Sequence, residues 1–295
     1  MVSVNKDSSS QRLEPAPGVL YVVGTPIGNL GDLSSRAKKI LESVSIIACE
    51  DTRHSGILLG KLQCSARKLS FHEHNSNQRI PELLVFLKEG KSIALISDAG
   101  LPGISDPGEK LVSSTREAGF EVIPIPGPCA AITALISSGL PSSRFCFEGF
   151  LPARGKGRKE VLKNISEEKR TTIIYESPHR LIQLLEELAQ LCSKDRPVHI
   201  ARELTKFHEE HISCNINSAL EYFLKNKPKG EFTLVLGGIK LNDKNQYNDE
   251  YILLKMKSLL KNGTSTNDAA KRLSIETGQS KRRIYNLLHS NIKNT

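Results

Sequence analysis

Apolar residues follow two patterns along the chain. Short runs rich in Val, Ile and Leu are typical of buried strands, and longer stretches with apolar residues every three or four positions predict helices. Seven strands are expected, at Val19–Val23, Ile46–Cys49, Ile93–Ile96, Glu121–Ile125, Thr172–Tyr175, Val198–Ala201 and Phe232–Leu236. Helical patterns lie between them, at Ser34–Ser43, Arg79–Glu89, Gly108–Ala118, Ala130–Ser138, His179–Leu191 and Ser218–Lys225. This alternation predicts an α/β fold built on a largely parallel sheet.

Two breaks in this pattern divide the chain. Gly, Pro and basic residues gather between Gly139 and Lys159, so we expect a junction there with α/β units on both sides. The polar stretch Lys240–Asn248 precedes a tail that has helical patterns and no strand pattern. We therefore expect a disordered N-terminal extension over 1–17, an N-terminal α/β domain over 18–138, a C-terminal α/β domain over 139–240, and a small basic helical extension over 249–295.

Composition argues against several classes of protein. The 295 residues are 38% hydrophobic and 25% charged, which suits a folded chain with a sizeable core. No stretch approaches the roughly 18 apolar residues of a membrane span, and residues 1–17 lack the apolar segment of a secretory signal. The six cysteines contain no CxxC pair, so we expect reduced thiols rather than disulfides or a zinc site. A cytoplasmic protein without a membrane partner is expected.

The net charge of +9 is concentrated in two segments. Residues 153–170 hold seven Lys and Arg against three acidic residues, and residues 245–295 hold nine against four. In the tail, a helix from Thr266, a turn at Gly278 and a helix that begins with Lys281–Arg283 resemble a helix-turn-helix. Cations at a helix N-terminus oppose the helix dipole, so we expect them to bind a phosphate backbone. The alternative is the solvated basic end of a helical bundle.

Three loops rich in Gly and Pro follow predicted strands, at Gly24–Asp32, Ser97–Gly108 and Pro126–Ala131. Neither GxGxxG nor GxxxxGK[ST] occurs, so a dinucleotide or P-loop site lacks support. Because the carboxyl ends of parallel strands meet at one edge, these loops predict a cleft for a small molecule. The two aspartates of the second loop suit a cofactor with a positive centre better than a phosphate. A simpler interpretation is a tight turn in which Ser105 or Asp106 caps the next helix.

Charged clusters follow three other strands, at Glu50–His54, Tyr175–Arg180 and Arg202–Lys206. Each could consist of helix caps and surface ion pairs, but their corresponding positions favour a functional role. The sequence His72-Glu73-His74 lacks a third ligand at suitable spacing, and no metal is predicted.

The loops also carry a family resemblance. The motifs GTPIGNL, EDTR, SDAGxPxISDPG, PGP, GFLP, YESPHR and RELTKxxEE occur in the order and approximate spacing typical of one branch of the tetrapyrrole methylase-like enzymes, which use S-adenosylmethionine. The branch that the chain resembles methylates small-subunit ribosomal RNA, and YESPHR with RELTKxxEE separates it from the corrin and porphyrin methylases. The match covers about residues 18–240, and the basic tail resembles the branch's C-terminal extension.

The resemblance implies two α/β domains of tetrapyrrole methylase type with S-adenosylmethionine in the cleft between them, in a homodimer. It implies 2′-O-methylation of a cytidine ribose in the decoding region, on small-subunit ribosomal RNA or the assembled small ribosomal subunit. Cofactor contacts implied by similarity are Pro26, Asp98, Gly100, Ile104, Ser105, Cys129, Ala130, Tyr175, Gly230, Glu231, Phe232 and Thr233. Cys129 stands where the family's pattern has Ser, and Leu101 and Gly103 stand where it has Thr and Leu.

The ribose 2′-hydroxyl is a poor acid, so a base or a cation near the developing alkoxide would assist its methylation. The charged clusters offer Asp51 or Glu203 as the base and Lys206 or Arg53 as the cation. Residues expected to contact RNA are Arg154, Lys156, Arg158, Lys159, His179, Arg180, Lys281, Arg282 and Arg283. Two alternatives remain: a methylase of a tetrapyrrole or other small metabolite on the same fold, and a nucleic-acid-binding regulator that senses a ligand. The basic tail favours an RNA substrate over a metabolite.

Overall fold

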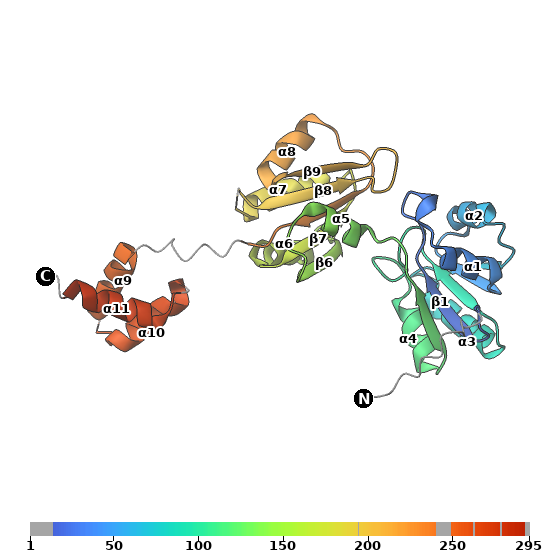
Figure 1. The fold of residues 1–295 in the computed structure, drawn as a ribbon, viewed down its shortest axis with the longest axis horizontal. Helices are drawn as coiled ribbons and strands as arrows, with labels where there is room; N and C mark the ends of the chain where they lie inside the picture. Colours follow the sequence, from blue (N-terminus) through green and yellow to red (C-terminus); the bar gives the residue numbers. More distant parts are fainter. Residues whose placement is uncertain (1–13, 194, 240–248, 262, 278, 293–295) are drawn as a thin grey trace. The chain divides into compact units, whose positions relative to one another are not determined.

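A computed structural model describes residues 14–193, 195–239, 249–261, 263–277 and 279–292 (Figure 1). The chain divides into two compact units, Met1–Ile239 and Lys240–Thr295. Most of the N-terminal extension expected over 1–17 lies outside the described residues. Glu14 forms an ion pair with Arg36, and the Ala16 amide donates to the Tyr21 hydroxyl at 2.8 Å. Residues Glu14 and Ala16 therefore contact the N-terminal α/β domain.

The first sheet is entirely parallel, in the order β3-β2-β4-β1-β5. Its strands are β1 Val19–Val23, β2 Ile46–Cys49, β3 Arg67–Ser70, β4 Ile93–Ile96 and β5 Glu121–Ile125. Four of these strands were predicted with the observed bounds. The edge strand β3 was missed because its sequence RKLS buries only Leu69, and so lacks an apolar run.

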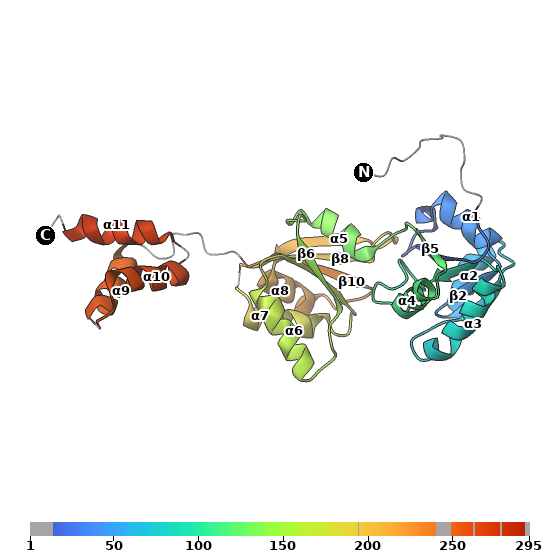
Figure 2. The same cartoon turned by 90° about the horizontal axis from the view of Figure 1, so that it is seen from below.

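Helices cover both faces of the first sheet (Figure 2). They are α1 Ser35–Ser43, α2 Thr52–Lys61, α3 Ser76–Lys88 and α4 Glu109–Glu117, and the short η1 Leu30–Asp32 stands in the loop after β1 with no buried residue. Alternate residues of β1 face opposite sides: Tyr21 packs with α1 and α2, and Leu20 packs with α3 and α4. Helix α2 was not predicted, and its Gly56 and Gly60 lower the local helix propensity.

The second sheet is mixed, in the order β6-β7-β10-β8-β9. Its strands are β6 Phe145–Phe150, β7 Thr171–Glu176, β8 Pro197–Arg202, β9 Glu210–Asn215 and β10 Phe232–Leu236. Only β6 and β7 pair in parallel, and the other three pairings are antiparallel. The α/β class is confirmed, whereas the expectation of parallel pairing is wrong for this sheet. The short connection between β8 and β9 permits only an antiparallel pair.

Helix α5 (Ala130–Ser138) covers one face of the second sheet through Ala134 and Leu135 (Figure 2). The opposite face is covered by α6 Lys156–Glu167, α7 Leu181–Leu191 and α8 Ile216–Lys225. Because α5 packs on the second sheet, the link between the two sheets lies at Pro126–Pro128. This is one helix earlier than the junction expected at Gly139.

The second unit is a bundle of three helices, α9 Asp249–Lys261, α10 Thr266–Thr277 and α11 Lys281–Ile292. Its core includes Ile252, Met256, Leu273 and Ile284. Helix α11 begins at Lys281, as the helix-turn-helix pattern predicted, and the Ser280 hydroxyl accepts from the Arg283 amide at 3.3 Å. No helix of the described residues is long and apolar enough to span a membrane.

Candidate functional site

Three loops meet at the carboxyl edge of the first sheet, as predicted. The Thr25 amide donates to the Gly100 carbonyl at 2.9 Å, and the Gly100 amide donates to the Thr25 carbonyl at 3.2 Å. Gly24 and Gly127 lie so close that a Cβ on either would fall 2.7 Å from the Cα of the other. Glycine at both positions is therefore a packing requirement.

A cavity of about 410 Å³ lies between these loops and the carboxyl end of β7. The structure brings ten of the twelve expected cofactor contacts to its wall: Asp98, Gly100, Ile104, Ser105, Cys129, Ala130, Tyr175, Glu231, Phe232 and Thr233. Pro26 lines an adjoining cavity instead, and Gly230 precedes Glu231 in a left-handed conformation with φ +88°. The volume suits a small organic ligand.

The cavity wall is acidic. It contains the carboxylates of Asp98, Asp106, Glu176 and Glu231, and among the described residues that line it there is no Lys, Arg or His. Burial, together with the nearby carboxylates of Glu50 and Asp98, raises the pKa of Asp106 to about 6. Such a wall favours a cationic ligand and disfavours a phosphate. Sequence reasoning did not assign Asp106 or Glu176 to the cofactor, although both stand inside the motifs that carried the resemblance.

Tyr175 ties the cavity wall to helix α5. Its hydroxyl accepts from the Ala131 amide at 3.0 Å, and its ring packs against Phe147 and Phe150 at centroid distances of 5.0 and 5.5 Å. Burial raises the pKa of Tyr175, so the hydroxyl stays neutral at physiological pH. Cys129 is the N-cap residue of the same helix and its thiol makes no capping hydrogen bond. The Tyr175 hydroxyl therefore accepts the hydrogen bond of the Ala131 amide, which a serine side chain at position 129 could otherwise accept.

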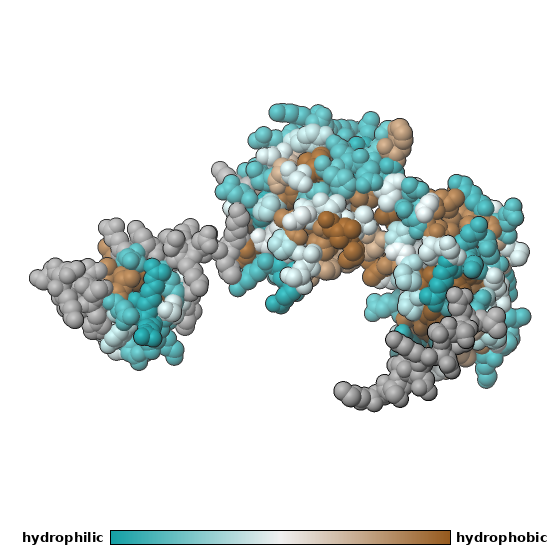
Figure 3. All heavy atoms as spheres, viewed as in Figure 1, coloured by the Kyte–Doolittle hydropathy of each residue, from teal (hydrophilic) through white to brown (hydrophobic). Residues whose placement is uncertain are grey.

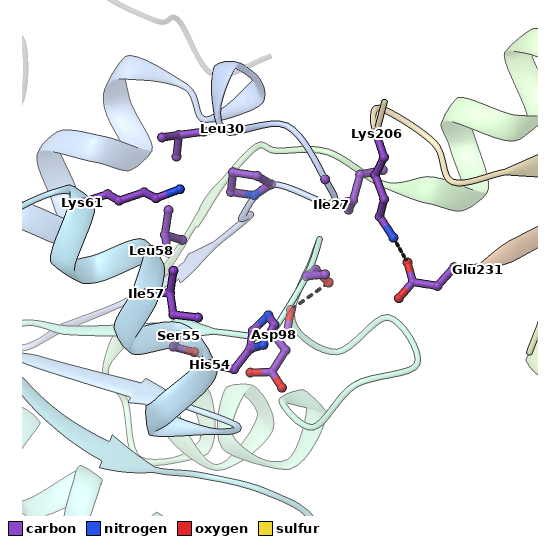
Figure 4. A pocket seen from close by; sticks show the side chains of 14 residues that line it. Ile27, Leu30, His54, Ser55, Ile57, Leu58, Lys61, Asp98, Lys206 and Glu231 are labelled. Carbon is purple, nitrogen blue, oxygen red and sulfur yellow. Dashed lines mark hydrogen bonds and ion pairs between the residues drawn. The ribbon is translucent and has the colours of Figure 1, made fainter. Parts of the chain in front are cut away.

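A second cavity, of about 340 Å³, adjoins the first (Figure 4). The two share Ile27, Asp98, Ala99 and Glu231 in their walls. The second cavity differs in composition, because helix α2 and the loop after β1 contribute apolar and basic side chains to it. Those side chains are Leu30, His54, Ile57, Leu58 and Lys61, and Lys206 joins them from the loop after β8.

Two of the expected catalytic residues, Glu203 and Lys206, form a network at the edge of the second cavity. The Lys206 ammonium donates to Glu203 Oε1 at 2.9 Å and to Glu231 Oε2 at 2.8 Å. Burial opposes ionisation of both Glu203 and Lys206, but their mutual hydrogen bond and those with Glu231 outweigh it, lowering the pKa of Glu203 and raising that of Lys206. A Cβ on Gly28 would overlap the Lys206 side chain, so the two loops are in close contact.

The other two, Asp51 and Arg53, pair with each other. Asp51 caps helix α2 by accepting from the Arg53 amide at 2.8 Å, and it also accepts from Arg53 Nη2 at 2.9 Å. The hydrogen bonds from Arg53 lower the pKa of Asp51 to about 2, which makes it a weak base. Neither residue lines the two adjoining cavities, although the Asp51 amide donates to Asp98 Oδ1 at 3.3 Å. Lys206 is therefore the better placed of the predicted charge stabilisers.

Among the residues expected to contact RNA, Arg158 differs from the expectation because it is buried and not exposed. Its side chain is only 3% exposed, its Nε and Nη2 donate to the Glu187 carboxylate, and its Nη1 donates to the Pro152 carbonyl at 2.9 Å. Arg180 similarly donates to the Leu151 carbonyl at 2.7 Å and lies 3.5 Å from Glu176. Both arginines hold the β6–α6 loop. The remaining residues are exposed: Arg154, Lys156, Lys159, His179, Lys281, Arg282 and Arg283, of which Arg283 pairs with Asp249 at 3.3 Å.

The His72–His74 segment lines a third cavity, of about 530 Å³, beside Glu50 and Glu109. Within the described residues no group of three or more His, Cys, Asp or Glu side chains is arranged to hold a metal ion. All six cysteines are free.

Comparison with known proteins identifies the class. The sequence profile of the tetrapyrrole (corrin/porphyrin) methylases matches residues 19–220. A solved uroporphyrin-III C-methyltransferase from Thermus thermophilus superposes with a TM-score of 0.52 at 18% identity, covering 74% of this chain and 94% of that one. A cobalt precorrin-4 methyltransferase superposes with a TM-score of 0.56 at 16% identity, covering 75% and 95%. The fold is therefore that of the tetrapyrrole methylases.

More similar relatives narrow the assignment. Proteins named ribosomal RNA small subunit methyltransferase I are 46% identical in Synechocystis sp., over 92% of this chain and 97% of the relative, and 48% identical in Thermotoga maritima, over 75% and 99%. The relative from Escherichia coli O157:H7 is 49% identical over 79% of this chain and 82% of its own length. The chain belongs to the ribosomal RNA small subunit methyltransferase I family. Methyltransferases of this family use S-adenosylmethionine as methyl donor.

Proposed function

We propose that this protein methylates the ribose 2′-hydroxyl of a cytidine in the decoding region of small-subunit ribosomal RNA, with S-adenosylmethionine as donor. The observation that carries the proposal is the pair of adjoining cavities, of which one is acidic and the other apolar with a basic rim. The names of the relatives support ribosomal RNA as the substrate.

The residues of the 410 Å³ cavity fit the cofactor. Asp98, Asp106 and Glu231 offer carboxylates to a positive centre and to amino or hydroxyl groups, and Ile104 and Phe150 offer apolar contact. Gly100, with φ +82°, lets the backbone approach where a Cβ would lie 3.3 Å from Ile27. S-adenosylmethionine, when bound, supplies a methyl group on a positively charged sulfur that becomes a neutral thioether once the ribose oxygen has taken the methyl.

The chain's own contribution is positioning and charge. Holding the acceptor in line can contribute about 7–11 kcal/mol to lowering the barrier. Lys206 lies at the rim of the second cavity and stabilises negative charge that develops on the ribose oxygen. Glu203 and Glu231 keep Lys206 charged and hold it in place. The proton of the hydroxyl leaves to water or to one of these carboxylates.

Exposed basic side chains bind the rest of the RNA in this proposal. Arg154, Lys156 and Lys159 stand at and after the β6–α6 loop, and Lys281 and Arg282 stand in the first turn of α11. They contact phosphates, which position the RNA without reading its sequence. Because the proposed substrate is ribosomal RNA, the proposed location of the protein is the cytoplasm.

A homodimer is part of the proposal. Helix α5 carries apolar side chains on its outer face, with Ile132 exposed and Ile136 73% exposed, and Phe145 of the neighbouring edge strand β6 is also exposed. Figure 3 shows hydrophobic surface gathered over α5 and β6. Apolar surface of this kind marks association sites, and a second copy of this chain is the partner that the resemblance implies.

The test is transfer of a labelled methyl group from S-adenosylmethionine to small-subunit particles purified from cells that lack the modification. Incorporation into these particles, and none into already modified particles, supports the proposal. Cofactor binding with label entering only a tetrapyrrole or another small metabolite would favour the alternative on the same fold. Absence of cofactor binding would contradict the enzyme assignment.

A further inference from the structure

Helix α2 presents an unusual face to the second cavity (Figure 4). His54, Ile57, Leu58 and Lys61 follow the spacing i, i+3, i+4, i+7 and therefore share one side of the helix. The main core contact is made from another side by Leu59, and Leu58 is partly buried against the same core. Ile57 is 63% exposed and Leu30, from the loop across the cavity, is 44% exposed. Solvent-facing helix positions are usually polar, so these apolar side chains are available to a ligand.

Charge separates the two cavities. Lys206 is already paired with Glu203 and Glu231, whereas Lys61 has no ion-pair partner among the described residues. Asp98 and Glu231 line both cavities, but the carboxylates of Asp106 and Glu176 belong to the first cavity, whose described lining contains no cation. An anionic group would therefore enter beside Lys61 and avoid the first cavity.

The cavities also adjoin each other, since both are lined by Ile27, Asp98, Ala99 and Glu231. A hydroxyl can take a methyl group only when the reacting atoms lie about 3–3.5 Å apart. An acceptor in the second cavity would reach a donor in the first across these shared residues. A volume of about 340 Å³ is in the range of small-ligand sites and suits a single nucleotide.

We propose that the cavity between helix α2 and the loop after β1 binds one unstacked nucleotide of the RNA acceptor. Ile57, Leu58 and Leu30 contact the base and sugar, and Lys61 binds an adjacent phosphate. Recognition of single-stranded RNA commonly combines such stacking or apolar contact with phosphate contacts. The inference rests on the proposed function, and it adds a substrate site formed by a helix that carries none of the cofactor contacts.

The test compares Lys61→Ala and Ile57→Ala with matched controls. Lys39→Ala removes an exposed lysine from α1, and Val85→Ala truncates an exposed aliphatic side chain on α3. Affinity for undermethylated small-subunit particles is measured at several salt concentrations without turnover, and affinity for S-adenosylmethionine is measured by calorimetry. Lys61→Ala is expected to weaken particle binding and to reduce the slope of log K against log salt by about one. Ile57→Ala is expected to weaken binding roughly three- to tenfold with the salt slope unchanged.

Both variants are expected to keep the wild-type cofactor affinity, and both controls to behave as wild type. Unchanged particle binding in Lys61→Ala and Ile57→Ala overturns the inference, and so does a loss of cofactor affinity, which would assign this cavity to the cofactor. Failure of the wild-type protein to methylate any particle would instead contradict the proposed function. The two failures are distinguishable because particle binding is measured without turnover.

Discussion

Asp106, in the wall of the acidic cavity, is a carboxyl group whose pKa lies close to physiological pH. Its pKa of about 6 leaves the carboxyl group protonated at pH 5 and ionised at pH 7. The ionised form attracts a cationic cofactor, so affinity for S-adenosylmethionine should fall as pH drops through 6. We expect a roughly fivefold loss between pH 7 and pH 5, measured by calorimetry.

The variant Asp106→Asn should bind S-adenosylmethionine more weakly at pH 7 and lose this dependence on pH. The control Glu109→Gln removes a carboxylate just outside the cavity and should retain the dependence. A flat wild-type profile between pH 5 and 7 would show that Asp106 does not face the cofactor.

Gly127 tests the contact between loops. In Gly127→Ala the new methyl group would lie 2.7 Å from the Gly24 Cα, and backbone cannot move aside as a flexible side chain can. Separation of these loops should reduce affinity for S-adenosylmethionine by about tenfold or more while the sheets stay folded. The control Gly157→Ala adds a methyl group with nothing within 4 Å, inside helix α6, and should be neutral or stabilising. Normal cofactor binding by Gly127→Ala would contradict the close packing of the site.

At the scale of elements, the interior strands were predictable, whereas three of the four edge strands were not. The strands β1, β2, β4, β5 and β10 match the predicted bounds residue for residue, and β5 does so although it is an edge strand that contains Glu121 and Pro124. The missed strands β3, β6 and β9 lie at or near sheet edges, where solvent exposure permits polar residues. The antiparallel pairing of the second sheet depends on the order in which strands are joined, which local periodicity does not encode.

The site was predictable to a similar extent. Loops rich in Gly and Pro at strand ends predicted a ligand cleft, because ligand approach demands unusual backbone, and the 410 Å³ cavity lies between these loops. The face of α2 that we propose to bind the acceptor nucleotide was not predicted, because Gly56 and Gly60 lower the helix propensity of this segment. The burial of Arg158 was not predictable, because clustered positive charge in the sequence does not reveal which guanidinium folds inward to meet Glu187.

The buried side chain of Arg158 stabilises the domain that is built on the second sheet. Arg158→Ala should lower the free energy of unfolding by about 2–3 kcal/mol, less than for a fully buried pair because the Glu187 side chain is 28% exposed. The neighbouring Lys159→Ala removes an exposed cation and should change stability by no more than about 0.5 kcal/mol. Urea denaturation measures both. If Arg158→Ala is as stable as the wild type but binds RNA more weakly, the original RNA-contact assignment stands.

At the scale of the whole molecule, the proposed dimer forms through the exposed apolar face of α5. Ile136→Asp places a charge at the most exposed apolar position of that helix and should convert a dimer to monomers in sedimentation equilibrium. The control Leu224→Asp introduces the same charge on α8, on the other face of the sheet, at a side chain that is 59% exposed. A wild-type monomer, or dissociation caused equally by both variants, would contradict dimerisation through α5.

The most direct test of the proposed reaction is the chemical position of the transferred methyl group. Labelled S-adenosylmethionine is incubated with the protein and with small-subunit particles that lack the modification, and the recovered ribosomal RNA is hydrolysed in alkali. A 2′-O-methyl group blocks cleavage of the adjacent phosphodiester, so we predict label in one alkali-resistant dinucleotide that begins with cytidine. Label on a base, or in fully cleaved nucleotides, would contradict ribose methylation even if the transfer is efficient.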